Sequence, residues 1–215
     1  DFGLHIKDRA GTLVPIDDAR LDELWQTAGE LGLPVLIHVG DPAAFFRPLD
    51  AENERVVELL RHPDWHFYPG FPSLEEIIDQ LERLVRRHAG TTFIGAHAGC
   101  YPENLGRVGA MMDAAPNWHV DIAARIPELG RQPRAARRLI EGHPDRVLFG
   151  TDQFGSNSLN PIYYRVLETE DEYFPYSPDD YPFGEGFWHV SGIGLGDDTL
   201  RAVYRDNARR ILRLP

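Results

Sequence analysis

The sequence has little of three things that would each point to a particular class of protein. Cys100 is the only cysteine among 215 residues, which excludes an intramolecular disulfide and makes a reducing, cytoplasmic location the expectation. Apolar runs stay far below the roughly 18 residues that a membrane-spanning helix needs. Basic residues are scarce too, with 22 Lys and Arg against 34 Asp and Glu and a net charge of -12. Since nucleic acids require clustered cations, we expect neither a nucleic-acid nor a membrane partner.

What is present fits an ordinary globular protein. Hydrophobic residues make up 42% of the sequence, and the length suits one sizeable domain or most of a larger one. No internal repeat, low-complexity tract or domain boundary is visible. We therefore treat residues 1–215 as one domain.

Short apolar runs at four places predict buried β-strands. The runs are Val35–Ile37, Thr92–Ile94, His119–Ile122 and Val147–Phe149. They show little alternation of apolar and polar residues, which is typical of strands buried on both faces. Helical patterns separate them, so the sequence predicts an α/β fold with parallel strands and helical crossovers.

The helical patterns differ in how clearly they are marked. Ser73 followed by Glu76 forms a capping-box pattern ahead of an apolar stripe. The other predicted helices span residues 17–31, 102–115, 133–142 and 199–212. Two regions depart from this pattern: residues 4–14 predict a small β-hairpin with glycine at its turn, and residues 157–196 predict an irregular, aromatic-rich excursion packed over the domain.

Three of the apolar runs lead into polar residues that suit metal chemistry. The first leads to His38, the second to His97 and the fourth to Asp152. Side chains at the carboxyl ends of parallel strands converge on one mouth, and two imidazoles with a carboxylate suit one divalent metal, Zn²⁺ first, with Mn²⁺ or Fe²⁺ as alternatives. Each residue alone also fits a structural role, as a hydrogen-bonded histidine or a helix-capping aspartate. The remaining histidines are expected to be structural: His5, His62, His66, His88, His119, His143 and His189.

Two other patterns offer weaker alternatives to a metal site. Cys100 lies three residues after His97, and a Cys/His pair can form a thiolate nucleophile. Gly192, Gly194 and Gly196 resemble a dinucleotide-binding loop but lack its spacing and its preceding strand. We expect the glycines to form a flexible lead into the last helix.

Arg125 follows the third apolar run and should project near the same mouth. A guanidinium at that place suits bidentate binding of a substrate carboxylate. A salt bridge to Glu128 or Asp121 is the equally supported alternative.

The strand endings resemble the amidohydrolase superfamily, in particular the amidohydrolase-related branch that contains the aminocarboxymuconate-semialdehyde and resorcylate-type decarboxylases. The matching segments, in order, are VLIHVGDP at 35–42, FIGAHAG at 93–99, VLFGTDQFG at 147–155 and VYRDNARRIL at 203–212. The resemblance implies a (β/α)8 barrel with a metal at its mouth. It implies that His38 is the strand-five metal ligand, that His97 is the strand-six ligand or acid/base group, and that Asp152 is the strand-eight ligand and proton shuttle.

One part of the family pattern is missing, because no two histidines in the chain stand two residues apart. The strand-one His-x-His and strands one to four are expected to lie before Asp1. The sequence thus predicts the C-terminal half of a TIM-like barrel, with strands five to eight present. This chain alone is expected to bind metal poorly and to be inactive.

The resemblance implies an enzyme that acts on a small molecule. The first hypothesis is a metal-dependent hydrolase that cleaves a C–N or C–O bond with activated water, with Asp152 and His97 moving protons. The second is non-oxidative decarboxylation at the same site. A third, from another class, is a catalytically silent module that binds a partner through residues 163–188. For that segment, a lid or a subunit contact in a homo-oligomer is the favoured interpretation.

Overall fold

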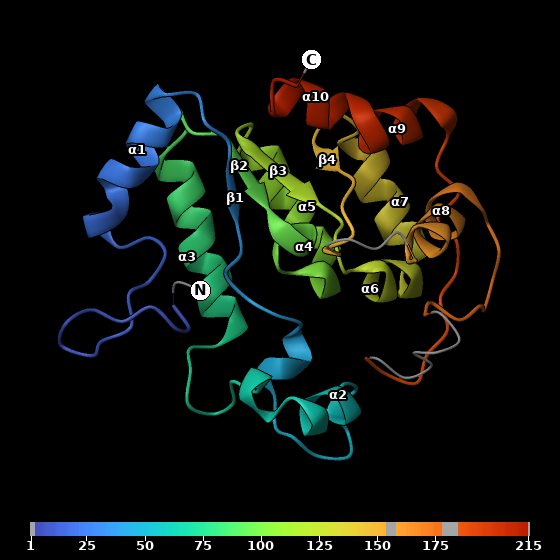
Figure 1. Cartoon of the computed structure of the whole chain (residues 1–215), viewed down its shortest axis with the longest axis horizontal. Coiled ribbons are helices and arrows are strands. Elements are labelled where there is room, and N and C mark those ends of the chain that lie inside the picture. The colour runs from blue at the N-terminus through green and yellow to red at the C-terminus, as the bar shows by residue number, and fades with distance from the viewer. Residues whose placement is uncertain (1–2, 154–157, 178–184, 215) are drawn as a thin grey trace.

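The computed structural model describes residues 3–153, 158–177 and 185–214, and a four-stranded parallel sheet lies at its centre (Figure 1). The strands are β1 (Val35–Ile37), β2 (Phe93–Gly95), β3 (Trp118–Asp121) and β4 (Val147–Leu148). Their order in the sheet is their order in the chain. All three pairings are parallel, which confirms the predicted α/β sheet.

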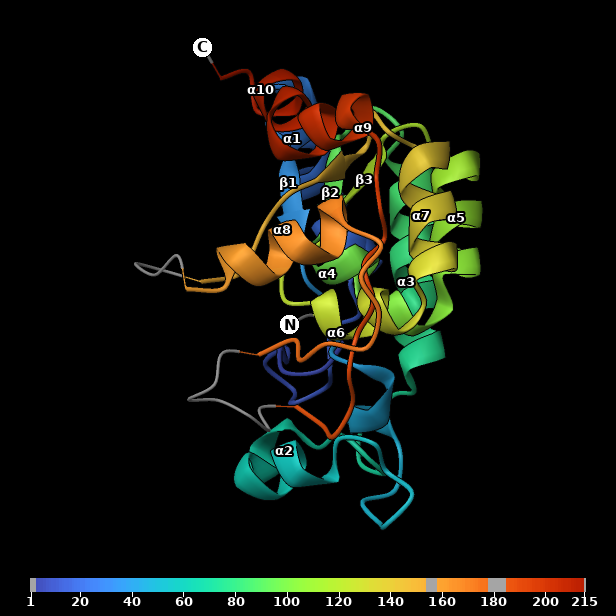
Figure 2. The same cartoon turned by 90° about the vertical axis from the view of Figure 1, so that its right-hand side faces the viewer.

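Helices connect the strands and cover one face of the sheet. The helices are α1 (Asp22–Glu30), α2 (Val56–Arg61), α3 (Leu74–Arg87), α4 (Ala96–Gly99), α5 (Leu105–Ala114), α6 (Ile126–Arg131), α7 (Pro133–Gly142), α8 (Asn160–Glu168), α9 (Asp197–Arg201) and α10 (Asn207–Ile211). The crossovers α3, α5 and α7 lie side by side along one face (Figure 2). Within the described residues, no helix has the length and apolarity that a bilayer crossing requires.

Packing on the covered face follows from the pattern of α3. The Ser73 side chain accepts a hydrogen bond from the Glu76 backbone N–H, and the Glu76 carboxylate accepts one from the Ser73 backbone N–H, as the capping-box pattern predicts. The apolar stripe of α3 is fully buried in the main core. Trp118 of β3 lies so close to β2 that a Cβ on Gly95 would be 2.3 Å from its ring. Glycine is therefore required at the end of β2.

The opposite face of the sheet is covered only in part by the described residues. Ile94 and Leu148 are buried there against Ile211 of α10. Leu36 of β1, in contrast, is 65% exposed. Within the described residues, one face of the sheet is thus covered by helices and the other is partly exposed.

Several predicted elements are shorter or more broken in the structure. The predicted hairpin is reduced to one antiparallel bridge, between Lys7 and Leu13. In the turn that closes it, the Gly11 N–H donates a hydrogen bond to the Asp8 carbonyl, and Gly11 has a φ of 83°. The final helix is interrupted by a π-helical segment, Ala202–Asp206. The excursion at 157–196 contains helix α8, which the sequence analysis missed. Phe174, Tyr176 and Val190 of the excursion are buried, as its aromatic content predicted.

Candidate functional site

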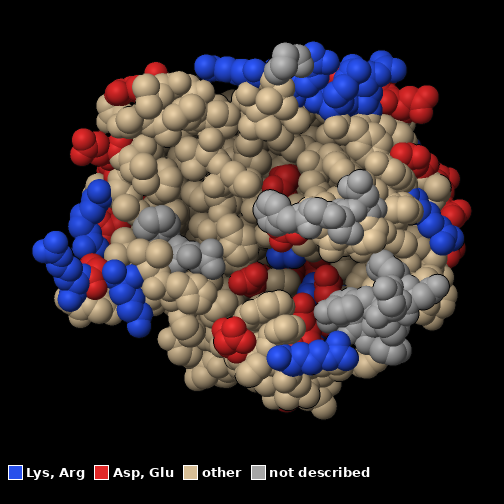
Figure 3. Space-filling view, in the orientation of Figure 1, with Lys and Arg blue, Asp and Glu red and all other residues tan. Residues whose placement is uncertain are grey.

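The structure places all four predicted site residues around one cavity. His38, His97, Arg125 and Asp152 line a cavity of about 480 Å³. We call it the histidine cavity. Figure 3 shows the molecule hollowed near the middle of one face, with acidic and basic side chains inside the hollow. The convergence of strand ends that the sequence predicted is therefore present.

The two histidines are held as a pair. Their rings are 5.0 Å apart between centroids and nearly perpendicular, at 84°. Nδ1 of His97 lies 2.8 Å from the Ala123 carbonyl oxygen. Because a carbonyl only accepts, Nδ1 carries the proton and Nε2 keeps its lone pair. That lone pair faces Asp152, whose Oδ2 lies 4.0 Å away.

An unusual backbone conformation presents these side chains. His97, Ala98, Ala124 and Asp152 adopt left-handed φ angles between 50° and 59°. Each costs free energy in a residue with a Cβ, and such residues cluster at functional sites. Asp121 supports the conformation, because its Oδ1 accepts hydrogen bonds from the backbone N–H groups of His97 at 2.9 Å and Ala123 at 3.0 Å.

Burial sets the protonation of both histidines. Desolvation, assisted by the Arg125 guanidinium, lowers the pKa of His97 to about 4. Desolvation also lowers the pKa of His38 below its usual value. Both rings are thus neutral near pH 7, the form in which a histidine can bind a metal or accept a proton.

The chemistry of these donors fits a divalent metal in part. Neutral imidazoles and a carboxylate are N and O ligands of the kind that Zn²⁺ and Mn²⁺ accept, and the fixed Nδ1–H of His97 is the orientation seen in metal-binding histidines. Across residues 3–153, 158–177 and 185–214, however, no three His, Cys, Asp or Glu side chains lie close enough together to hold a metal ion. His38 and Asp152 do not form a complete metal site within this part of the chain.

The structure argues against the thiolate alternative. Cys100 is 1% exposed, and burial raises the pKa of its thiol to about 11. Its Sγ accepts a hydrogen bond from the Val39 backbone N–H at 3.4 Å. A protonated thiol closed off from the cavity is a packing residue.

Arg125 is buried and has no anionic partner within ion-pair distance among the described residues. It is 6% exposed, and its Nη1 donates to the Ala124 carbonyl at 2.8 Å, while its Nε has no hydrogen-bond partner. The alternative of a salt bridge to Glu128 or Asp121 is wrong, since Arg125 forms no ion pair within the described residues. A buried guanidinium with spare donors at a cavity wall is suited to binding an anion.

A second buried charge cluster, which the sequence analysis missed, borders the same cavity through Arg55, Glu58 and Glu185. Arg55, 2% exposed, pairs with Glu58 at 2.6 Å, with Glu185 at 3.1 Å and with Glu128. Trp188 lies over the guanidinium at 5.6 Å. Arg55 and Glu58 are three positions apart, but Glu128 and Glu185 come from distant parts of the chain, so no local pattern marks the whole cluster. We call them the Arg55 cluster.

The histidines expected to be structural have mixed placements. His88 and His143 lie 2.9 Å from Asp22 and Asp113 respectively, in contacts that join neighbouring helices. His5, in contrast, lines the histidine cavity. It lies outside any strand, so the strand-end pattern gave no signal for it.

Glu185 makes the stability of the fold depend on pH. Burial, together with repulsion from Glu128 and Glu58, raises the pKa of Glu185 to about 7, although Arg55 acts in the opposite sense. The folded state therefore binds more protons than the unfolded state above the ordinary pKa of Glu, and stability falls as pH rises toward and through 7. Glu185→Gln removes this ionisation. We expect its stability relative to wild type to rise by on the order of 1 to 3 kcal/mol between pH 5 and pH 8.

Urea unfolding of both proteins across this pH range measures the effect. Glu172→Gln, at an exposed glutamate, serves as the matched control and should show no such trend. Parallel pH profiles of wild type and Glu185→Gln would contradict the assignment.

Comparison with known proteins identifies the family. The model of the Amidohydrolase family matches residues 3–214, so the chain belongs to this family. No curated protein gives a significant match.

Solved structures show the same fold at low identity. A 2,6-dihydroxybenzoate decarboxylase from Rhizobium aligns with a TM-score of 0.53, 18% identity and coverage of 99% of this chain and 61% of its own. A protein described as an amidohydrolase II aligns with a TM-score of 0.50 and 15% identity, and the alignment covers 92% of this chain and 57% of that protein. A TIM-barrel protein from Bordetella bronchiseptica aligns with a TM-score of 0.48 and 14% identity, and the alignment covers 94% of this chain and 53% of that protein. The chain thus spans little more than half the length of these proteins.

Proposed function

We propose that this chain is the C-terminal half of a (β/α)8 barrel enzyme, with β1 to β4 as barrel strands five to eight. The sequential parallel order supports the assignment, as does the coverage of 57% to 61% of two similar structures. The exposed Leu36 fits a sheet face that a complete barrel would cover.

We propose that the enzyme is a metal-dependent hydrolase that acts on a C–N or C–O bond of a small molecule. The observation that carries the proposal is the meeting of His38, His97 and Asp152 at one cavity, with both imidazoles neutral. His38 and Asp152 would hold a divalent metal, most simply Zn²⁺, together with ligands from the rest of the barrel. A bound metal supplies a Lewis acid that activates water and polarises a substrate oxygen.

The residues of this chain then move the proton. Asp152 takes a proton from the attacking water, because its carboxylate faces the cavity beside His97. At 4.0 Å from Oδ2, His97 Nε2 is near enough to receive that proton directly after a small shift or through one water. His97 delivers it to the leaving group. Arg125 binds a carboxylate of the substrate and holds it against the wall of the cavity.

Decarboxylation is the second candidate, and Arg125, which has no ion-pair partner among the described residues, suits it equally, because a decarboxylase must bind a carboxylated substrate. The same groups would then protonate the carbon that loses CO₂. Oxygen-18 from water appears in the product of hydrolysis, whereas decarboxylation releases CO₂, so mass spectrometry separates the two.

Removing the metal from the full-length protein tests the proposal. We expect a chelator to lower turnover by about 100-fold or more, because the water then keeps its high pKa, and we expect Zn²⁺ or Mn²⁺ to restore it. Metal content by plasma mass spectrometry should be stoichiometric before treatment. A full-length protein without metal, and without affinity for added Zn²⁺ or Mn²⁺, would instead favour the silent binding module.

A further inference from the structure

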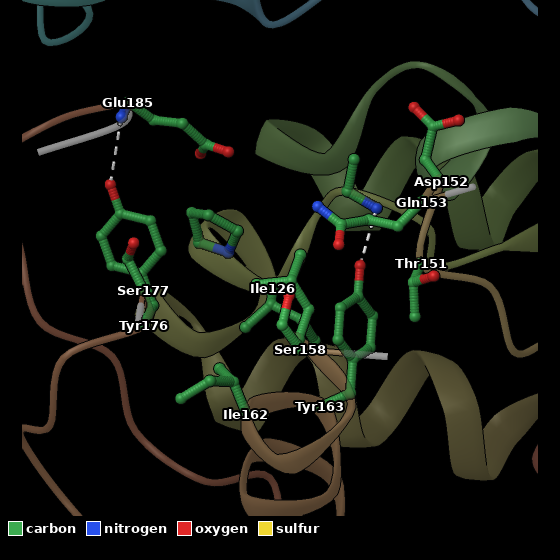
Figure 4. A pocket seen from close by; sticks show the side chains of 13 residues that line it. Ile126, Thr151, Asp152, Gln153, Ser158, Ile162, Tyr163, Tyr176, Ser177 and Glu185 are labelled. Carbon is green, nitrogen blue, oxygen red and sulfur yellow. Dashed lines mark hydrogen bonds between the residues drawn. The ribbon is translucent and has the colours of Figure 1, made fainter. Parts of the chain in front are cut away.

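A second cavity adjoins the histidine cavity and has a different chemical character. It also measures about 480 Å³, and Ala124, Asp152 and Glu185 line both cavities. Figure 4 shows Asp152 and Glu185 on one side of it, with Ile162 and Tyr163 on the other. We call it the tyrosine cavity.

One short segment forms the wall between the two cavities. Ala124 borders both, Arg125 lines the histidine cavity, and Ile126 and Pro127 line the tyrosine cavity. A ligand whose charged end is bound by Arg125 in the histidine cavity therefore lies next to the wall of the tyrosine cavity. Both cavities are within the size range of small-molecule sites.

The lining of the tyrosine cavity combines apolar side chains with the neutral polar side chains of Thr151, Gln153, Ser158 and Ser177. Ile126, Leu159 and Ile162 contribute aliphatic side chains. The Tyr163 hydroxyl accepts a hydrogen bond from the Ala124 N–H at 2.7 Å (Figure 4). The Tyr176 hydroxyl accepts one from the Gly186 N–H at 3.1 Å. Both tyrosines thus have their hydroxyls engaged with backbone, while their rings pack on Phe149 and Trp188 and form part of the cavity lining.

The charges around the tyrosine cavity select against an anion. No Lys or Arg is among its described lining residues, and its two carboxylates, Asp152 and Glu185, lie on the boundary with the histidine cavity. The spare guanidinium donors are on the other side of the wall, at Arg125. An anionic group is therefore favoured in the histidine cavity, and a neutral group in the tyrosine cavity.

We propose that the tyrosine cavity is a second subsite that binds a neutral, largely apolar group, such as an aromatic ring, of a substrate whose carboxylate is held by Arg125. This inference rests on the proposed function, because it takes the histidine cavity as the reacting centre. It narrows the substrate class to monocarboxylates that carry an apolar extension.

Two probes of different length test the subsite. Benzoate carries the carboxylate and one ring, and biphenyl-4-carboxylate adds a second ring. Calorimetric titration of the full-length protein should show biphenyl-4-carboxylate binding about 10- to 100-fold more tightly, from the apolar area that the second ring buries. Ile162→Trp, which fills the cavity from α8, should abolish this gain and leave the affinity for benzoate unchanged.

Further variants keep the test decisive. Leu159→Trp fills the cavity from another position and should act in the same way if Ile162→Trp does not fold. Tyr164→Trp adds bulk on the same helix at a residue outside the cavity, so it should retain the gain. Equal affinity for the two probes, a gain that survives both filling variants, or no binding of either probe would overturn the proposal. Metal content and metal-dependent turnover report on the proposed function separately.

Discussion

Asp152→Asn in the full-length protein is expected to lower kcat by about 100- to 10,000-fold, the usual range for loss of a positioned proton-transfer group. Asparagine keeps the size of the side chain but cannot take a proton from water. The effect should fall on kcat more than on KM, because Arg125, and not Asp152, holds the substrate in the proposed arrangement. Steady-state kinetics with metal-loaded protein, alongside metal analysis, measures it.

Asp64→Asn is the matched control for this substitution. Asp64 is another carboxylate that lines the histidine cavity, but it does not follow a strand of the sheet. Its replacement should leave kcat nearly unchanged. Unchanged turnover in Asp152→Asn would remove the proposed proton path.

Arg55→Met should destabilise the fold by about 3 to 5 kcal/mol at pH 8, the range for breaking a buried ion pair by removing one partner. Methionine retains much of the buried volume but removes the cation shared by Glu58, Glu128 and Glu185, and leaves Glu128 only the longer contact to Arg131 at 3.9 Å. Burial makes Glu128 the most costly of these, since it is 1% exposed and its Oε2 has no hydrogen-bond partner among the described residues. Thermal or urea unfolding measures the loss.

Arg55→Met should lower the free energy of unfolding by less at pH 5 than at pH 8. Burial raises the pKa of Glu185 to about 7, so at pH 5 this carboxyl is protonated and no longer needs a cation. Arg83→Met is the control. Arg83 pairs with Asp17 at 2.7 Å but is 59% exposed, and such surface pairs contribute about 0 to 1 kcal/mol. Equal, small losses in both variants would show that the Arg55 cluster adds nothing beyond a surface pair.

The parts of the fold that local patterns encode were predictable. Short apolar runs located all four strands, and Ser73 with Glu76 located the start of α3. The candidate site was predictable for the same reason, since His38, His97 and Asp152 each follow the end of a strand within about four residues and parallel strands end at one edge of the sheet.

The missed features depend on distant contacts. Arg55 and Glu185 are 130 positions apart in the sequence, and nothing near either residue marks the ion pair. Helix α8 was missed because its proline start and paired tyrosines lie in an aromatic-rich stretch without a clear helical stripe. The tyrosine cavity was missed with it, because α8 supplies one of its walls.

The hydrogen bond between Tyr163 and Ala124 has a consequence for how the two cavities act together. It anchors the dividing wall to α8 at a residue with a left-handed φ of 50°, one position before Arg125. A ligand that shifts Tyr163 therefore moves the backbone that positions the Arg125 side chain. By thermodynamic linkage, an anion bound at Arg125 changes the affinity of the tyrosine cavity by the same factor. The two subsites are expected to show cooperative, not additive, binding.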